Sequence, residues 1–189
     1  MPFFSFLEDA SGVGDVMVHQ PERYLPLARF TQLLMRGPSP LSAAERELIA
    51  AYVSGLNGCG YCHGSHTAIA ADLGVEPDLL RALLDDVEGA NVEERMKPVL
   101  RYVEKLTQSP SRMTQADADA VFAAGWDEQA LADAVAICAL FNLYNRVVDG
   151  HGITGSPDNF AEVAERVNRQ GYEKRTRDAL EARGERHDG

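Results

Sequence analysis

The chain has 189 residues, of which 45% are hydrophobic and 25% are charged, and its formal net charge is −11 at pH 7. This size and composition are typical of one soluble globular domain with a sizeable hydrophobic core. The negative charge argues against nucleic acid and against an anionic membrane as partners, because both repel an acidic protein.

The first twenty residues show little periodicity, and we expect an extended arm whose Phe3, Phe4 and Phe6 dock on the body or on a neighbouring subunit. This start has no basic segment and turns acidic at Glu8, unlike a signal peptide. No run approaches the roughly 20 apolar residues that a membrane span requires. We therefore expect a cytoplasmic protein, in a compartment that keeps thiols reduced.

Apolar residues recur at helical spacing along the chain, and no strand-like alternation is sustained, so the predicted fold class is all-α. Helices are expected over residues 21–35, 42–56, 59–73, 77–84, 91–108, 114–125, 127–148 and 156–171. The helix over 127–148 is apolar on most of its circumference and should be central. We divide the chain into an N-terminal arm (1–20), a helical domain (21–160) and a charged helical tail (161–189).

The two helices expected over residues 42–73 form the most distinctive part of the chain. Ser42 and Glu45 make a capping box that opens the first helix, and glycines around Gly58 let the chain turn back. A weak internal repeat is present, because the pattern at 41–45 recurs at 113–117. The second copy has no cysteine pair and no histidine, so only the first copy can carry thiol chemistry.

Cys59 and Cys62 form a C-x-x-C motif at the start of the second of these helices. In a helical turn their Cα atoms would lie about 5 Å apart, within the disulfide range of about 4.4–6.8 Å. His66 follows on the same helix face. If the two helices run antiparallel, residues at equal distances on either side of the turn lie opposite each other. This pairing puts Glu47 within about one helical turn of His66. Because a helix N-terminus lowers a thiol pKa, these residues favour a reversible dithiol/disulfide pair with a carboxylate–imidazole proton relay.

Four interpretations of this segment remain open. In a thiol redox centre, a thiolate attacks a peroxide oxygen, becomes a sulfenic acid and is resolved to a disulfide. Cys59–His63 also has the C-x-x-C-H pattern of c-type haem attachment, against which the missing export signal counts. A zinc site would lack a second cysteine/histidine pair and would use Cys59, Cys62, His66 and Glu47. The cysteines could also be two small buried residues without chemistry.

Other polar or reactive residues give weaker signals. Cys138 is expected to be a buried small hydrophobe, and His63 to be exposed or bonded to the backbone. His151 is expected in a loop, from which it could also line the site. Three polar residues interrupt the central helix, where they make buried hydrogen bonds, a subunit contact or a substrate contact: Asn142, Asn145 and Arg146.

The run AERELIAAYVSGLNGCGYCHGSHTAIA, followed later by FNLYNRVVDGHGI, resembles the AhpD-like alkylhydroperoxidases of the carboxymuconolactone decarboxylase superfamily, especially the peroxidase-related branch. The resemblance is specific over residues 41–75 and extends over about 21–160. It implies an all-helical homo-oligomer, commonly a trimer or hexamer. It also implies a thiol-dependent peroxidase that takes a hydroperoxide, is reduced by a lipoyl or thioredoxin-type dithiol, and needs no cofactor or metal.

On this resemblance Cys62 is the peroxidatic cysteine and Cys59 the resolving one, while His66 and Glu47 form a proton relay through water. Tyr61 departs from the pattern, because well-studied AhpD proteins have a second histidine between the cysteines. A tyrosine with a pKa of about 10 cannot serve as a base near neutral pH, so we expect weaker activity or a different substrate. The decarboxylase branch lacks the cysteine pair, which disfavours lactone decarboxylation. A redox sensor that forms the disulfide without turnover stays open.

Overall fold

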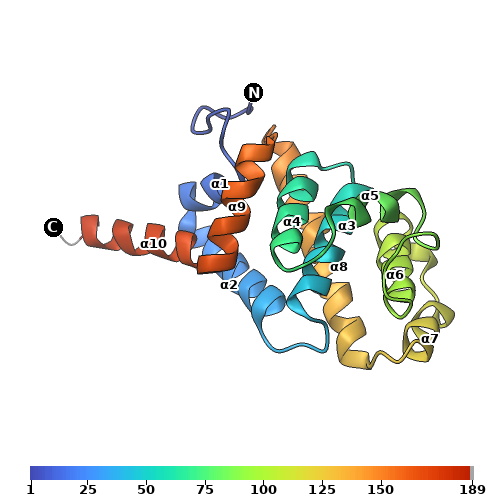
Figure 1. Cartoon of the computed structure of the whole chain (residues 1–189). Helices are drawn as coiled ribbons and strands as arrows, with labels where there is room; N and C mark the ends of the chain where they lie inside the picture. Colours follow the sequence, from blue (N-terminus) through green and yellow to red (C-terminus); the bar gives the residue numbers. More distant parts are fainter. Residues whose placement is uncertain (188–189) are drawn as a thin grey trace.

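The computed structural model describes the backbone of residues 1–187, and all regular elements within this range are helical (Figure 1), which confirms the predicted fold class. The elements are α1 Val13–His19, α2 Pro21–Arg36, α3 Ala43–Leu56, α4 Gly60–Asp72, α5 Pro77–Asp85, α6 Met96–Gln108, a 3-10 turn Pro110–Arg112, α7 Gln115–Ala123, α8 Glu128–Gly150, α9 Pro157–Gln170 and α10 Lys174–His187.

Side-chain caps begin the helices at the predicted places. The amide of Glu45 donates to Ser42 Oγ over 3.2 Å, and Glu45 Oε2 accepts from the Ser42 amide over 2.7 Å. Asp117 Oδ2 accepts from the Thr114 amide over 2.7 Å, which opens α7 in the same way. Asp127 caps α8 through a 2.7 Å bond from the Ala130 amide. These bonds satisfy amides that a helix start leaves without partners.

Helix α8 is the centre of the fold, as its apolar sequence predicted. It packs against α3, α6 and α2 and buries Ala134, Ile137, Phe141 and Val148. By length and composition it would pass as a membrane span, with a mean hydropathy of 1.4, contrary to our expectation that no segment would. Half of the 18-residue stretch of α8 that has this hydropathy is buried inside the fold. The packing of α3 and α6 around α8 therefore already accounts for its apolar character.

Helices α3 and α4 form the predicted hairpin and pack against each other more extensively than any other pair. The chain turns at Gly58, whose φ of 71° is a left-handed conformation that favours glycine. The Cys59 amide donates to the Ser54 carbonyl over 3.0 Å and closes this turn. Helix α9 then covers α4 on its outer side (Figure 1).

Two boundaries differ from the expectations. The supposed extended arm contains α1, which begins where Asp15 Oδ2 accepts from the Gly12 amide over 2.8 Å. Helix α6 begins at Met96 and not at Asn91, because the Met96 amide bonds the Glu93 carbonyl in a tight turn. Pro98 consequently lies in the first helical turn, where its missing N–H costs no hydrogen bond.

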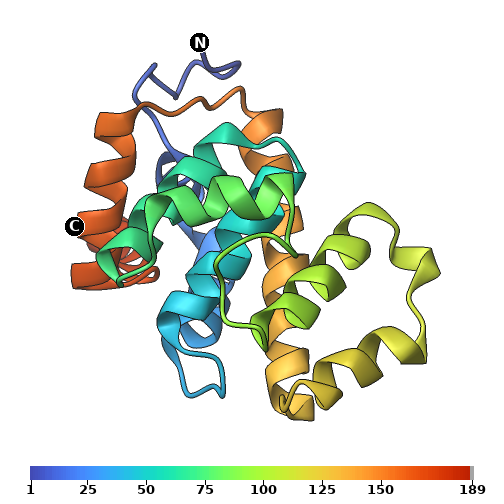
Figure 2. The same ribbon diagram turned by 45° about the vertical axis from the view of Figure 1, so that its right-hand side comes forward.

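The last two helices lie on the opposite side of α8 from the lobe formed by α6 and α7 (Figure 2). Helix α9 packs against α4, and α10 runs along α2 and α1. The division of the chain at residues 20 and 160 stays a prediction, although α9 crosses the second boundary without a break. This arrangement brings α9 and the segment that follows it back to the α3–α4 hairpin.

Candidate functional site

The two cysteines of the motif lie together at the start of α4. Cys59 is the N-cap residue, with 0% of its surface exposed, and Cys62 is 3% exposed. Both thiols are free, and they are close enough for Cys59 to shift the pKa of Cys62. The side-by-side placement expected from the C-x-x-C spacing is therefore present.

The expectation of a lowered thiol pKa is wrong for Cys62. Its pKa lies well above the ordinary value, because it shares a hydrogen bond with Cys59, is buried and is close to the negative charge that Cys59 carries when ionised. A hydrogen bond with Asn145 acts in the opposite direction. Once one sulfur of the pair is ionised, the second therefore holds its proton firmly.

Asn145 links α8 to the turn between the two helices of the hairpin. Its side-chain amide donates to Ser54 Oγ over 3.0 Å, and its Oδ1 accepts from Asn57 Nδ2 over 2.8 Å. The same side chain lowers the Cys62 pKa. Of the roles left open for Asn145, buried hydrogen bonding is the observed one, and it positions the turn that carries the cysteines.

The imidazole of His66 meets the carboxylate of Glu47 inside the hairpin. His66 Nδ1 lies 2.6 Å from Glu47 Oε2, and both residues are buried. The contact is direct, where the family resemblance implied an intervening water. Burial raises the Glu47 pKa, but the charge and hydrogen bond of His66 and the nearby Arg36 outweigh it, so the pKa is below the ordinary value.

Two further residues hold the other carboxylate oxygen, and sequence reasoning missed both. Glu47 Oε1 accepts from Arg36 Nη1 and from the Tyr172 hydroxyl, each over 2.5 Å. The Tyr172 ring also stacks on His66, with centroids 6.2 Å apart. Burial and the charge of Glu47 raise the Tyr172 pKa well above its usual value, so the hydroxyl stays a donor. The one available signal was that Tyr172 is the only aromatic residue after Phe160.

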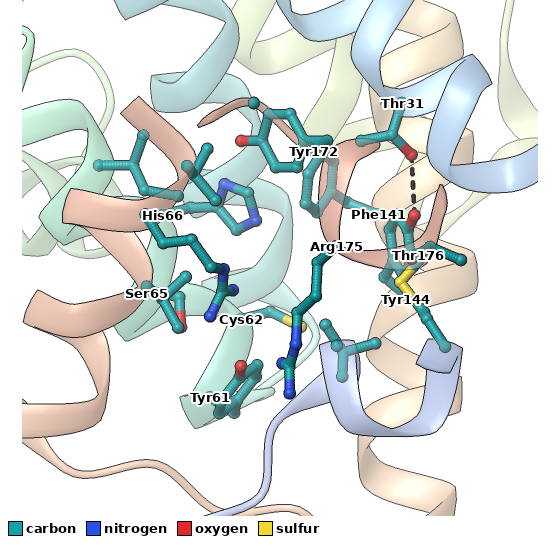
Figure 3. Close-up of a pocket in the computed structure, with 18 residues that line it drawn as sticks. Thr31, Tyr61, Cys62, Ser65, His66, Phe141, Tyr144, Tyr172, Arg175 and Thr176 are labelled. Carbon is teal, nitrogen blue, oxygen red and sulfur yellow. Dashed lines mark hydrogen bonds between the residues drawn. The ribbon is translucent and has the colours of Figure 1, made fainter. Parts of the chain in front are cut away.

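A cavity of about 70 Å³, partly open to solvent, lies beside this network (Figure 3). It is lined from α4 by Tyr61, Cys62, Ser65, His66 and Ile69, and otherwise mainly by residues of α1, α8, α9, α10 and the segment between the last two. Cys62 lines it and Cys59 does not. Cys62 is therefore the sulfur that a small molecule in the cavity would meet.

Tyr61 stands at the edge of this cavity. It also lines a second, more polar cavity of about 260 Å³ that shares Val163, Arg166 and Arg175 with the first. Burial raises the Tyr61 pKa. Its hydroxyl thus stays protonated near neutral pH, and it can donate a hydrogen bond but cannot act as a base.

Several other candidates lie away from the cavity. His63 Nδ1 is 2.9 Å from the Ala51 carbonyl, which matches the expected backbone bond. His151 Nδ1 is 2.6 Å from the Val147 carbonyl, and its ring packs on Phe4. Cys138 is buried, as expected. Asn142 and Arg146 bond to each other and to Asn57.

The haem and zinc alternatives find little support in the geometry. With His63 turned to a backbone carbonyl, the C-x-x-C-H motif offers no axial ligand beside its two buried sulfurs. Among the side chains of residues 1–184, no three His, Cys, Asp or Glu residues converge on a point that could hold a metal ion. His66 could join a zinc site only by giving up its bond to Glu47.

Comparison with known proteins agrees with this geometry. Residues 21–105 match the model of the carboxymuconolactone decarboxylase family. The segment that carries the α3–α4 hairpin is thus similar to that family, and the fold is AhpD-like. The matched segment contains Glu47, Cys59, Cys62 and His66 but ends within α6, so Tyr172 lies outside it.

Two solved structures are similar over most of this AhpD-like chain. An uncharacterized peroxidase-related protein from Silicibacter sp. TM1040 is 26% identical, with a TM-score of 0.73 over 80% of this chain and 79% of its own. An uncharacterized peroxidase-related protein from Ralstonia eutropha JMP134, described as an alkylhydroperoxidase AhpD core, is 24% identical, with a TM-score of 0.72 over 79% of this chain and 78% of its own. No curated protein matches the chain.

Proposed function

We propose that this AhpD-like protein is a thiol-dependent peroxidase that reduces a hydroperoxide with the Cys59/Cys62 pair. One observation carries the proposal. Cys62 and His66 line the same cavity, and the Nδ1 atom of His66 lies 2.6 Å from Glu47 Oε2. A nucleophile, a base and the group that orients the base thus meet where a substrate can enter.

The bond to Glu47 assigns the roles of the two imidazole nitrogens. With Nδ1–H donated to the anionic carboxylate, the lone pair of His66 is on Nε2, which makes no hydrogen bond within the described chain. His66 takes a proton from the cysteine pair. Glu47 stays ionised because its pKa is lowered, and its charge stabilises the imidazolium that forms.

The chemistry then runs in three balanced steps. The Cys62 thiolate attacks the terminal peroxide oxygen, the O–O bond breaks, and the departing alkoxide takes the proton from His66 and leaves as an alcohol. The Cys59 sulfur next attacks the sulfenic sulfur of Cys62, the S–O bond breaks, and hydroxide leaves as water with the Cys59 proton. An external dithiol reduces the resulting disulfide by exchange and is itself oxidised to a disulfide.

The test is steady-state peroxide consumption by the reduced protein, with dihydrolipoyl and thioredoxin-type donors compared. We expect Cys62→Ser to abolish turnover, and Cys59→Ser to consume one equivalent of peroxide and stop as a sulfenic acid or mixed disulfide. Cys138→Ser is the matched control, because that thiol lies outside the cavity. Normal turnover by Cys62→Ser would reject the proposal.

The runner-up function is a redox sensor that forms the same disulfide without turning over. It predicts one oxidation event per protein, even with excess dithiol, whereas a peroxidase consumes many equivalents. With the peroxidase we propose a homo-oligomer in a reducing compartment. Size-exclusion chromatography with light scattering checks the assembly.

A further inference from the structure

Two arginines line the cavity that contains Cys62. Arg166 comes from α9 and Arg175 from α10, and no Asp or Glu is among the lining residues. Glu47 is fully buried behind His66 and does not line the cavity. A chain with a net charge of −11 therefore presents two positive side chains at its candidate site.

The two guanidinium groups differ in what neutralises them. Arg175 Nη2 bonds Asp15 Oδ1 over 2.5 Å. Arg166 makes no hydrogen bond or ion pair with the side chains that the structure describes. Burial and the charge of Arg175 lower the Arg166 pKa, and the attraction of Asp15 and Glu162 offsets this only partly. A half-buried cation without a direct partner favours an anion in the cavity.

A buried hydroxyl on α4 points to a ligand independently. Ser65 is 2% exposed, and its Oγ has no hydrogen-bond partner in the described part of the chain. It lies one helical turn after Cys62, and both line the cavity (Figure 3). Buried hydroxyls are rarely left without a partner, since this costs folding free energy. A ligand oxygen would supply the missing partner.

Several other lining residues are apolar. Met17, Ile69, Val163, Val167 and Phe141 contribute side chains without charge. A ligand that matches this lining has a hydrocarbon body and one anionic end. A carboxylate suits a guanidinium in particular, because the two planar groups can form paired hydrogen bonds.

We propose that the preferred substrates are organic hydroperoxides that carry a carboxylate, which Arg166 binds while the peroxide group meets Cys62. This inference rests on the proposed peroxidase function. Ser65 supplies a further hydrogen bond to a substrate oxygen, and the apolar residues hold the hydrocarbon body between the two ends.

The test compares cumene hydroperoxide with its para-carboxylate, which differ by the charged group alone. Dithiothreitol serves as reductant, because it carries no carboxylate of its own. In wild type we expect kcat/KM to be higher for the carboxylate. In Arg166→Gln the ratio of the two kcat/KM values should fall by about tenfold or more, as for loss of a charged hydrogen bond, and Arg166→Lys should restore part of it.

Arg169→Gln is the matched control, because Arg169 lies on the same helix with an exposed side chain and should leave the ratio unchanged. Calorimetric titration with 4-isopropylbenzoate separates this inference from the peroxidase proposal. Benzoate binding that Arg166→Gln weakens supports the carboxylate site even if no peroxide is consumed. If peroxide is consumed, but Arg166→Gln leaves the ratio of the two kcat/KM values unchanged and the wild type does not bind 4-isopropylbenzoate, the carboxylate site is overturned. The peroxidase proposal then still stands.

Discussion

The Tyr172 hydroxyl donates a 2.5 Å hydrogen bond to Glu47 Oε1, although 125 residues separate the two in sequence. Gly171, with a φ of 74°, ends α9 and turns the chain so that the next side chain points back at the hairpin. The bond leaves Oε2 free for His66. The C-terminal segment thus fixes the orientation of a carboxylate that belongs to α3.

Replacing Tyr172 by Phe tests this orientation while it keeps the ring on His66. We expect a loss of about 1–3 kcal/mol in the free energy of unfolding, because a buried carboxylate oxygen loses a donor. The Glu47 pKa should rise, since the lost bond lowered it, and the acidic limb of the pH–rate profile should move to higher pH. Tyr102→Phe is the control, because the Tyr102 hydroxyl makes no hydrogen bond with the side chains that the structure describes, those of residues 1–184. Identical urea midpoints and pH profiles for the two variants would contradict the role of Tyr172.

The lowered pKa of Glu47 predicts a pH-dependent contribution to stability. A carboxyl whose folded-state pKa is below its ordinary value of 4.5 stabilises the fold above that pH, and the contribution is lost as pH falls through the folded-state pKa. Glu47→Gln removes the titrating group and leaves Arg36 without its ion pair. Urea unfolding should therefore show a large deficit for this variant at pH 7 that shrinks below about pH 4. A deficit that is the same at every pH would argue against an ionised Glu47.

The same substitution tests the proton relay. With an uncharged amide beside it, His66 is a poorer base and its imidazolium loses a stabilising charge. We expect peroxide turnover to fall by about 10²–10⁴-fold, the usual contribution of general acid–base catalysis. His66→Gln in the Glu47→Gln background should cause little further loss, because the two residues act as one unit. If the double variant loses turnover by the product of the factors that the two single substitutions cause, the two residues act independently and a relay is contradicted.

The raised pKa of Cys62 predicts which substitution makes this sulfur more reactive. Cys59 is the first cause of the shift, through a hydrogen bond and through its charge. In Cys59→Ser the Cys62 thiolate should therefore form at lower pH than in wild type. The measurement is the rate of Cys62 alkylation against pH, followed by mass spectrometry in a Cys138→Ser background. An unchanged or higher midpoint would show that burial alone sets the pKa.

Asn145 should contribute both to stability and to the state of the thiol. Asn145→Ala removes its bonds to Ser54 and Asn57, and we expect a destabilisation of about 2–4 kcal/mol from the loss of one buried and one part-buried hydrogen bond. The Cys62 pKa should rise, because the Asn145 bond lowers it. Asn142→Ala on the same helix is the comparison, since that side chain is only half-buried. Equal effects of the two substitutions on Cys62 alkylation would contradict the assignment.

The features that sequence predicted correctly are close together along the chain. The capping boxes span three residues, the C-x-x-C spacing spans one helical turn, and the contact between Glu47 and His66 spans a single hairpin. Helix geometry sets such distances once a turn has been located, here at Gly58. The catalytic roles of these residues remain predictions.

The sequence by itself determined an all-helical chain with a cysteine pair at a helix start and a carboxylate beside an imidazole, because helix periodicity and caps are local properties. Only the tertiary structure decided what surrounds them. Asn145 reaches the hairpin from α8, and Tyr172 reaches it from the segment after α9. Arg166 of α9 lines the cavity beside the hairpin. The direction of the Cys62 pKa shift was likewise decided there, because burial and neighbouring charge depend on how the distant helices pack.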